Sequence, residues 1–267
     1  MFPFGICMST KIGIFGGSGF YNIPNMEKKD SIRMATPYGM PSSSIDKFKL
    51  EDKEIYFIAR HGINHEYPAH VVNYRANIYA FKSLGVERII SIQTVGSLKE
   101  EYSPGTIVIP DQFVDFTKKR DYSFYNGGKS IHISMADPFC PELRSLAINA
   151  IKGLDIKYQP KGNYVCIEGP RFSTRAESHM FRSFADIIGM TLVPEAILAR
   201  ELEMCYLSIA TVTDYDSWKE SHVTAEEVTE TMKQNVNKTL KILEKMLPAI
   251  PKNPSCSCHT ALKDAEI

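Results

Sequence analysis

Two carboxylates, Asp214 and Asp216, stand two residues apart directly after an apolar run at residues 205–212. The run is typical of a buried strand, and open α/β sheets bind their ligands just past the carboxyl ends of strands. Two acceptors on one short loop match two adjacent N–H groups of a base such as adenine. An Asp that caps a helix beside a solvated neighbour is the alternative. The pair therefore predicts a nucleobase site only if other polar groups meet at the same place.

Three further polar clusters follow predicted strands. Glycines allow backbone N–H groups to approach an anion, and an Arg-His pair offers a bidentate guanidinium with a second donor for phosphate. Singly, the clusters also fit a tight turn, a surface pair or an ordinary strand end. Because parallel strands bring their carboxyl ends to one edge of a sheet, we expect them to converge on an anion. The strands at 11–15, 54–59 and 88–92 are followed by Gly16-Gly17-Ser18-Gly19, Arg60-His61 and Gln93-Thr94, respectively.

The elements that must position these groups alternate between short β-rich runs and helical patterns. Further strands are expected at 106–109 and 164–167, a helix at 69–84, and a long amphipathic helix after the capping box at 224–227. This order predicts a single-domain α/β fold, a mixed twisted sheet flanked by helices. We expect an extension at residues 1–10, the domain at 11–250 and a tail with Cys-Ser-Cys at 251–267.

Charge and hydropathy exclude several classes of partner. Lys plus Arg number 31 and Asp plus Glu number 31, so no net charge attracts nucleic acid or an acidic membrane surface. No apolar run approaches the roughly 20 residues that cross a bilayer. The first eight residues lack a basic segment typical of a secretory signal. These features predict a cytoplasmic protein without nucleic-acid or membrane partners.

Seven segments, in order and spacing, resemble those of 5'-methylthioadenosine phosphorylases in the trimeric class of the purine nucleoside phosphorylase superfamily. The resemblance implies that the chain is a pentosyltransferase of purine and methionine salvage. It would cleave 5'-methylthioadenosine with inorganic phosphate as co-substrate and no cofactor, giving adenine and 5-methylthioribose 1-phosphate, as a homotrimer or homohexamer. The segments begin at Gly16, Arg60, Asn73, Pro110, Glu168, Met190 and Thr213.

The resemblance also assigns roles to individual residues. Asp214 would donate a proton to N7 of adenine while Asp216 accepts from the N6 amine or supports Asp214, although the two roles could be exchanged. Met190 would lie beside the ribose and Phe172 would stack on the purine; core packing is the alternative for both. Phosphate would be bound by Ser18, Arg60, His61, Gln93, Thr94 and Thr191.

Specificity for the base and the 5' group is implied at Ser173 and at Ala225 or Val228. His132 resembles a histidine that reaches the 5' pocket of a neighbouring subunit, although a His between isoleucines also fits a structural strand residue. A purine nucleoside phosphorylase of broader range, accepting adenosine, inosine or guanosine, is the alternative enzyme. A non-catalytic purine-binding protein is the alternative of another class.

Two features fit the family less simply. Ile63 stands where many relatives carry a basic residue, which puts phosphate affinity in question. Cys256-Ser257-Cys258 fits a metal half-site, a strained disulfide or a reactive tail. A metal needs ligands that the sequence does not reveal, so no metal is predicted. Resemblance to archaeal members from hot environments implies structural disulfides, with Cys140 and Cys205 as a candidate pair.

Overall fold

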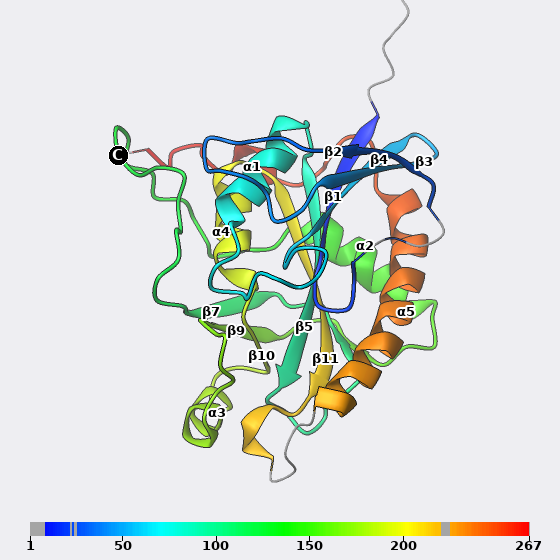
Figure 1. Ribbon diagram of the computed structural model, residues 1–267, viewed down its shortest axis with the longest axis vertical. Coiled ribbons are helices and arrows are strands. Elements are labelled where there is room, and N and C mark those ends of the chain that lie inside the picture. Colours follow the sequence, from blue (N-terminus) through cyan, green and yellow to red (C-terminus); the bar gives the residue numbers. More distant parts are fainter. Residues whose placement is uncertain (1–8, 22, 24–25, 220–224, 267) are drawn as a thin grey trace, which may run out of the picture.

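A mixed β-sheet runs through the middle of the molecule, and helices cover both of its faces (Figure 1). The computed structural model describes residues 9–21, 23, 26–219 and 225–266, without the side chains of 225–228. The strands are β1 (Thr10–Gly16), β2 (Lys28–Ile32), β3 (Ile45–Leu50), β4 (Lys53–Ala59), β5 (Arg88–Ser97), β6 (Ile107–Val108), β7 (Gln112–Phe116), β8 (Tyr158–Gln159), β9 (Asn163–Ile167), β10 (Ile187–Gly189) and β11 (Cys205–Asp214). The helices are α1 (Tyr74–Ser83), α2 (Pro141–Lys152), α3 (Arg175–Phe181), α4 (Leu192–Glu201), α5 (Ala225–Ala249) and the 3-10 turns η1 (Asp216–Trp218) and η2 (Cys258–Thr260).

Strand β5 is the centre of the sheet. It pairs in parallel with β1 and β11 and antiparallel with β10, while β1 pairs in parallel with β4. The carboxyl ends of β4, β1, β5 and β11 therefore meet at one edge, where the predicted polar clusters begin. This topology confirms the single-domain mixed sheet flanked by helices.

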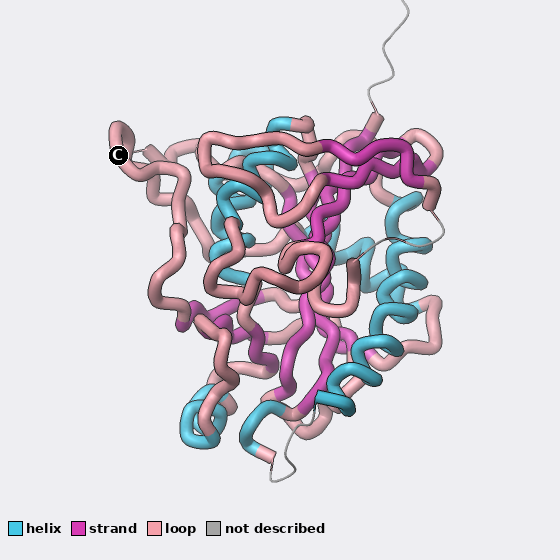
Figure 2. Tube along the Cα trace, viewed as in Figure 1, coloured by secondary structure: helices cyan, strands magenta, loops and turns pink. Residues whose placement is uncertain are grey.

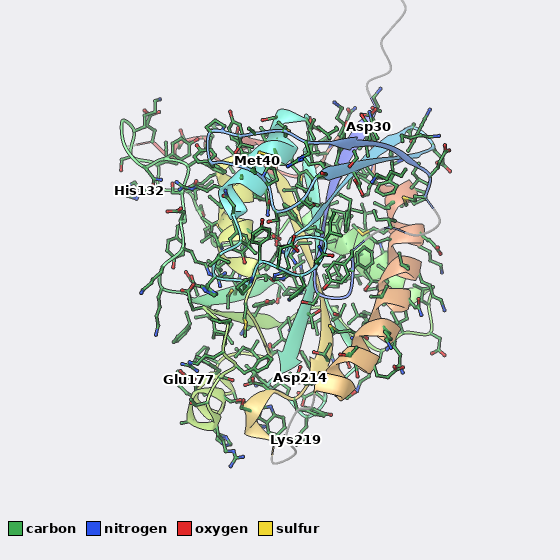
Figure 3. The ribbon with its side chains drawn as sticks, in the orientation of Figure 1. Asp30, Met40, His132, Glu177, Asp214 and Lys219 are labelled. Atoms are coloured by element: carbon green, nitrogen blue, oxygen red, sulfur yellow. The ribbon has the colours of Figure 1, made fainter. Side chains whose placement is uncertain are left out.

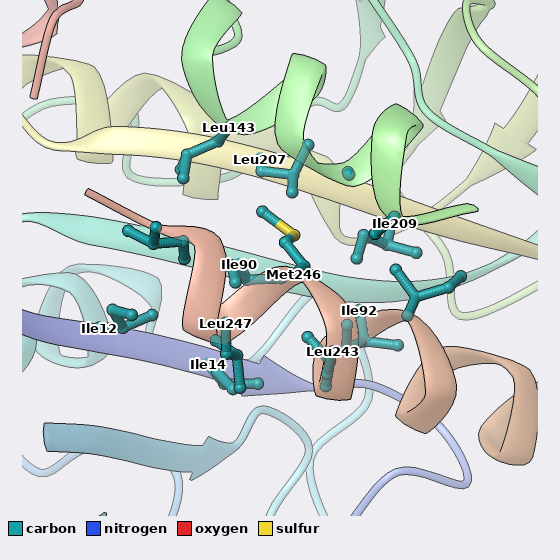
Figure 4. Close-up of a cluster of buried hydrophobic side chains, with 14 of the residues drawn as sticks. Ile12, Ile14, Ile90, Ile92, Leu143, Leu207, Ile209, Leu243, Met246 and Leu247 are labelled. Atoms are coloured by element: carbon teal, nitrogen blue, oxygen red, sulfur yellow. The ribbon is translucent and has the colours of Figure 1, made fainter. Parts of the chain in front are cut away.

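Two apolar layers hold the helices on the sheet. On one face, alternate strand residues such as Ile12, Ile90 and Leu207 pack with Leu143 of α2 and Met246 of α5 (Figure 4). A second buried cluster on the other face joins the sheet to α1 and α4. Burial of each such side chain contributes roughly 1.5–3 kcal/mol, so these layers fix the sheet against which the polar edge is built.

Two predicted boundaries were wrong, for identifiable reasons. Helix α1 begins at Tyr74 rather than at residue 69, because the Asn73 side chain accepts from the Ala76 N–H at 3.1 Å and caps it there. Strand β5 does not end at Ile92 but continues to Ser97, because β11 stays paired with it through Val95 and beyond. Gln93 and Thr94 are thus strand residues with side chains on opposite faces. The same pairing makes Asp214 the last residue of β11 rather than a loop residue.

The segment after α5 returns to the sheet. Cys256 and Cys258 are buried in the same apolar layer as α2 and α5. By contrast, the long segment between β7 and α2 is drawn mainly as loop (Figure 2). The capping box predicted at 224–227 falls partly outside the described residues, and no side chains are described for the rest of it. Within the described part of the chain, no helix is both long and apolar enough to span a bilayer.

Candidate active site

A cavity of about 490 Å³ opens at the edge where β4, β1, β5 and β11 end. This volume is within the range of small-molecule sites. Loops after β9 and β10 and one residue of α5, Met232, complete its wall. The sequence-predicted residues that line it are Ser18, Arg60, His61, Thr94, Phe172, Met190, Thr191, Asp214 and Asp216.

Arg60 is fully buried at the inner wall and paired with an acid that the sequence analysis did not single out. Its Nε and Nη2 donate to the two Glu195 carboxylate oxygens at 2.7 and 3.1 Å. Ser91 Oγ and the Tyr206 hydroxyl donate to Glu195 at 2.5 and 2.8 Å. Burial alone would lower the pKa of Arg60, but the charge of Glu195 and the hydrogen bonds to it raise that pKa above its ordinary value.

This pairing changes what Arg60 can offer to an anion. Of the five N–H groups of a guanidinium, four already donate, to Glu195 twice, to Ser91 Oγ at 2.6 Å and to the Ile92 carbonyl at 3.0 Å. The predicted bidentate contact of Arg60 with phosphate is therefore wrong in its geometry. Glu195 occupies the paired Nε and Nη2 donors, and only one N–H, on Nη1, remains for an anion. Gly17 leaves room for it: a Cβ there would lie 3.2 Å from Nη1 and 2.5 Å from the Ile92 oxygen.

His61 is neutral at ordinary pH. Burial and the charge of Arg60 lower its pKa to about 4. Its Nδ1 lies 2.8 Å from the Tyr67 carbonyl oxygen, which can only accept, so Nδ1 carries the proton. Nε2 is then an acceptor, not the second donor that was predicted. It can receive a hydrogen bond from a protonated oxygen of an anion.

Three hydroxyls complete this end of the cavity. Ser18 follows β1, and Thr94 from β5 donates to the Ser18 carbonyl oxygen at 3.4 Å. Thr191 precedes α4 but its side chain does not cap that helix. The end of the cavity near Arg60 thus combines one cation with hydroxyls.

Gln93 does not reach the cavity. Its amide donates to the Tyr206 hydroxyl at 3.3 Å and accepts from Ser208 Oγ at 2.7 Å, and the side chain is fully buried. Because β5 continues past Ile92, strand alternation directs Gln93 and Thr94 to opposite faces. The structure therefore corrects the expected direct phosphate contact of Gln93.

The carboxylate pair lies within the same cavity, on the carboxyl end of β11. Thr213 Oγ1 and the Asp216 backbone N–H donate to the two oxygens of Asp214 at 2.7 and 2.9 Å. Ser173 Oγ lies 2.7 and 2.6 Å from the two oxygens of Asp216. Gly96 opposite is required for this approach, since a Cβ there would lie 3.0 Å from Asp214 Oδ2.

The two acids differ in their environment. Burial, with a smaller contribution from the charge of Asp216, raises the pKa of Asp214 despite the hydrogen bonds from Thr213 and the Asp216 N–H. Asp216 is held by the Ser173 hydroxyl and adopts a left-handed backbone conformation with φ of 50°. The environment of Asp214 thus favours retention of its proton.

The remaining predicted residues are placed as follows. Phe172 lines the cavity mouth and is 72% exposed, while Met190 lies deeper. Ser173 contacts Asp216 rather than the cavity surface. His132 is exposed, with its backbone N–H donating to Ala265 at 2.8 Å, well away from Asp214 (Figure 3). The side chains of Ala225 and Val228 lie outside the described residues.

Sequence reasoning missed three polar or adaptable residues of the wall. The Tyr21 hydroxyl lies 3.0 Å from Nδ1 of His65, and His65 stacks on His61 with ring centroids 4.6 Å apart. Met232 faces the cavity from α5. The sequence offered one signal for His65, namely its position in the same loop as Arg60. It offered no signal for Tyr21.

The cysteines do not form the predicted disulfide. All five described cysteines are free, and four of them, Cys140, Cys205, Cys256 and Cys258, gather in one buried cluster. Sγ of Cys205 lies 3.3 Å from Sγ of Cys256, whereas bonded sulfurs lie about 2.05 Å apart. The expected pairing of Cys140 with Cys205 is therefore replaced by a group of four thiols.

Comparison with known proteins decides the family. Residues 11–248 match the Phosphorylase superfamily. The chain belongs to the phosphorylase superfamily. One relative is the S-methyl-5'-thioadenosine phosphorylase of Pyrococcus furiosus, which is 59% identical to this chain. The match covers 95% of this chain and 98% of the relative's sequence. The S-methyl-5'-thioadenosine phosphorylase of Thermofilum pendens is 55% identical over 97% of this chain and 99% of its own.

Solved phosphorylase-superfamily structures agree with the fold. A methylthioadenosine phosphorylase from an antarctic soil metagenomic library has a TM-score of 0.91 and 42% identity, covering 97% of this chain and 93% of its own. The methylthioadenosine phosphorylase of Schistosoma mansoni in complex with adenine has a TM-score of 0.91 and 34% identity. The match covers 96% of this chain and 99% of that structure's chain.

Proposed function

We propose that this chain is a pentosyltransferase that cleaves 5'-methylthioadenosine with inorganic phosphate, releasing adenine and 5-methylthioribose 1-phosphate. Relatives named S-methyl-5'-thioadenosine phosphorylase match it over nearly their full length at up to 60% identity. Related structures hold adenine or methylthioadenosine. The observation that carries the proposal is one cavity with an anion-binding end at Arg60 and a buried carboxylate pair, Asp214 and Asp216.

At the anion end, phosphate would act as the nucleophile toward C1' of the ribose. The free Nη1 hydrogen of Arg60 and the hydroxyls of Ser18 and Thr191 would donate to three of its oxygens. The Thr94 hydroxyl would join them once it turns from the Ser18 carbonyl oxygen, to which it donates in the structure. Neutral His61 would accept from the remaining protonated oxygen, which a dianion still carries at neutral pH. Glu195 neutralises Arg60 in part, so the site would bind phosphate firmly enough to orient it without trapping it.

At the other end, the leaving adenine gains negative charge as the C1'–N9 bond stretches. Protonation of N7 would stabilise this charge, and the raised pKa of Asp214 fits it for the role of general acid. Asp216, oriented by Ser173, would accept from the N6 amine. Asp214 thus supplies the proton and Asp216 recognises the base.

This division of roles favours a 6-aminopurine. A 6-oxopurine would place a carbonyl against the Asp216 carboxylate and leave both acceptors unpaired, which costs affinity. Phe172 would stack on the purine and Met190 would lie beside the ribose, while Met232 adds apolar surface to the wall. The predicted preference is methylthioadenosine over adenosine, with inosine and guanosine cleaved least.

A cleavage assay with and without phosphate on those four nucleosides tests the proposal. Phosphate-dependent release of adenine, with methylthioadenosine the best substrate, is the expected result. A preference for inosine would favour the purine nucleoside phosphorylase of broader range. Binding of methylthioadenosine without any cleavage in phosphate would favour the non-catalytic purine-binding protein.

We further propose that the active form is a homotrimer or a homohexamer in the cytoplasm. His132 is exposed and distant from its own cavity, as a residue that serves a neighbouring subunit would be (Figure 3). The exposed Phe172 at the cavity mouth supports a partner surface there. Sedimentation at assay concentration should give a trimer or larger, and His132→Ala should weaken methylthioadenosine binding without changing the assembly. A fully active monomer would contradict this arrangement.

A further inference from the structure

We propose that Cys140, Cys205, Cys256 and Cys258 form a structural zinc site. Their four Sγ atoms all lie within 4.8 Å of one another and all four residues are buried. In a tetrahedral site with zinc–sulfur bonds of about 2.3 Å, the sulfurs stand about 3.8 Å apart. The cluster is thus the size of a four-thiolate zinc site, and the two ligands missing from the Cys-Ser-Cys segment are those supplied by Cys140 and Cys205.

The backbone around the ligands is fixed by the fold. Cys140 precedes α2, and its N–H donates to the Tyr206 carbonyl at 2.9 Å. Cys205 begins β11, and its N–H donates to the Glu87 carbonyl at 2.8 Å. Cys256 and Cys258 enter from the segment after α5. Three separate parts of the chain therefore bring sulfur to one point, which a zinc ion would join together.

Arg88 provides independent support. It stands in register with Cys205 on the adjacent strand β5, and on the same face as Ile90 and Ile92 of the apolar layer that contains the cysteines. Its side chain is fully buried, and its Nε and Nη1 have no hydrogen-bond partner among the described residues. Its other terminal nitrogen, Nη2, reaches the Lys252 carbonyl, in the same returning segment, at 3.5 Å.

Within the described part of the chain, this cation has no buried acid as an ion-pair partner. Its ion pair is with Glu87, at 3.8 Å, and 65% of the Glu87 side chain is exposed. A buried charge is stable only when it is paired. Four thiolates around one Zn²⁺ carry a net charge of minus two, whereas thiols or disulfides carry none. A zinc–thiolate centre would therefore supply the charge that Arg88 lacks.

The site would be structural rather than catalytic. Cys205 begins β11 and Asp214 ends it, and with a rise of about 3.3 Å per residue the two ends lie about 30 Å apart. Zinc binding would release one proton from each of the four thiols and needs no oxidant. Two disulfides, by contrast, would require removal of four electrons.

Metal analysis of the full chain tests the proposal. Protein expressed with added zinc and purified without chelator should hold about one zinc per chain after gel filtration. Chain refolded with cobalt in place of zinc should show the visible bands of tetrahedral cobalt and the near-ultraviolet bands of cobalt–thiolate bonds. Less than about one zinc per ten chains would overturn the proposal, whether alkylation in denaturant then finds free thiols or disulfides.

Paired variants locate the metal. Cys256→Ser combined with Cys258→Ser should lower bound zinc at least about tenfold, and Cys166→Ser should leave it unchanged. Cys166 is the matched control, because it is equally buried but lies outside the cluster. Zinc retained by the double variant would overturn the assignment. Should the double variant fail to fold, the cobalt spectrum of the unaltered chain still decides.

Discussion

Replacement of Glu195 by Gln would test the buried network behind the anion end of the cavity. Glu195 and Arg60 are both fully buried, and the carboxylate accepts from Arg60, Ser91 and Tyr206. The amide keeps the shape but removes the negative charge, so Arg60 becomes an unpaired buried cation. Breaking such a pair costs about 3–5 kcal/mol. At about 2–4 °C per kcal/mol for a chain of this size, the midpoint of thermal unfolding should fall by about 6–20 °C.

Differential scanning calorimetry and phosphate kinetics measure the two consequences. Because Arg60 loses the partner that orients it, KM for phosphate should also rise about tenfold, equivalent to about 1.4 kcal/mol. Glu100→Gln is the matched control, since Glu100 pairs with Lys219 at 3.0 Å on the surface and such pairs contribute about 0–1 kcal/mol. A Glu195→Gln variant as stable as the control, with an unchanged KM, would refute the role given to this network.

Three more predictions concern the two ends of the cavity. Asp214→Asn should lower turnover about 10²–10⁴-fold with little change in phosphate binding. For the unaltered chain we expect the rate to fall as pH rises through the raised pKa of Asp214, and this fall should be absent from the variant. Equal losses in turnover and phosphate affinity would contradict the acid role. Ser173→Ala should raise KM for methylthioadenosine about tenfold, because hydrogen bonds to a charged group contribute about 1.5–3 kcal/mol. Ser173→Thr keeps the hydroxyl and should change this KM less. Identical kinetics of the two variants would count against a role of Ser173 in positioning Asp216. Because the pKa of His61 is lowered to about 4, its contribution to the free energy of unfolding is complete above pH 6.5 and is lost as pH falls toward 4, a loss of about 3 kcal/mol. Urea unfolding of His61→Asn should therefore depend less on pH than unfolding of the unaltered chain. An unchanged pH dependence would show that His61 is not its source.

Local pattern was sufficient to predict where polar groups would meet. Strands β1 and β4 each carry apolar residues up to a polar turn, and sheet topology then places Ser18, Arg60 and Thr94 at one edge. Pairs that are distant in sequence were not predictable. Glu195 lies 135 residues from Arg60 in the sequence. No sequence pattern near either residue indicates that the Glu195 carboxylate pairs with the Arg60 guanidinium.

The error at Gln93 has a different origin. An apolar run marks the buried part of a strand, not its end, and β5 remains a strand for as long as β11 pairs with it. Once the strand extends past Ile92, alternation sends Gln93 and Thr94 to opposite faces. The sequence alone indicated which residues are polar, but the partner strand determined which of them faces the cavity.

The burial of Cys256 and Cys258 makes one end of the core depend on residues that follow every described strand in the sequence. Both residues lie in the apolar layer that contains α2 and α5. In a chain not yet translated as far as Cys256, Cys140, Cys205 and the charge of Arg88 would lack these neighbours. This end of the core can therefore be covered only once the segment with Cys256 and Cys258 has been made.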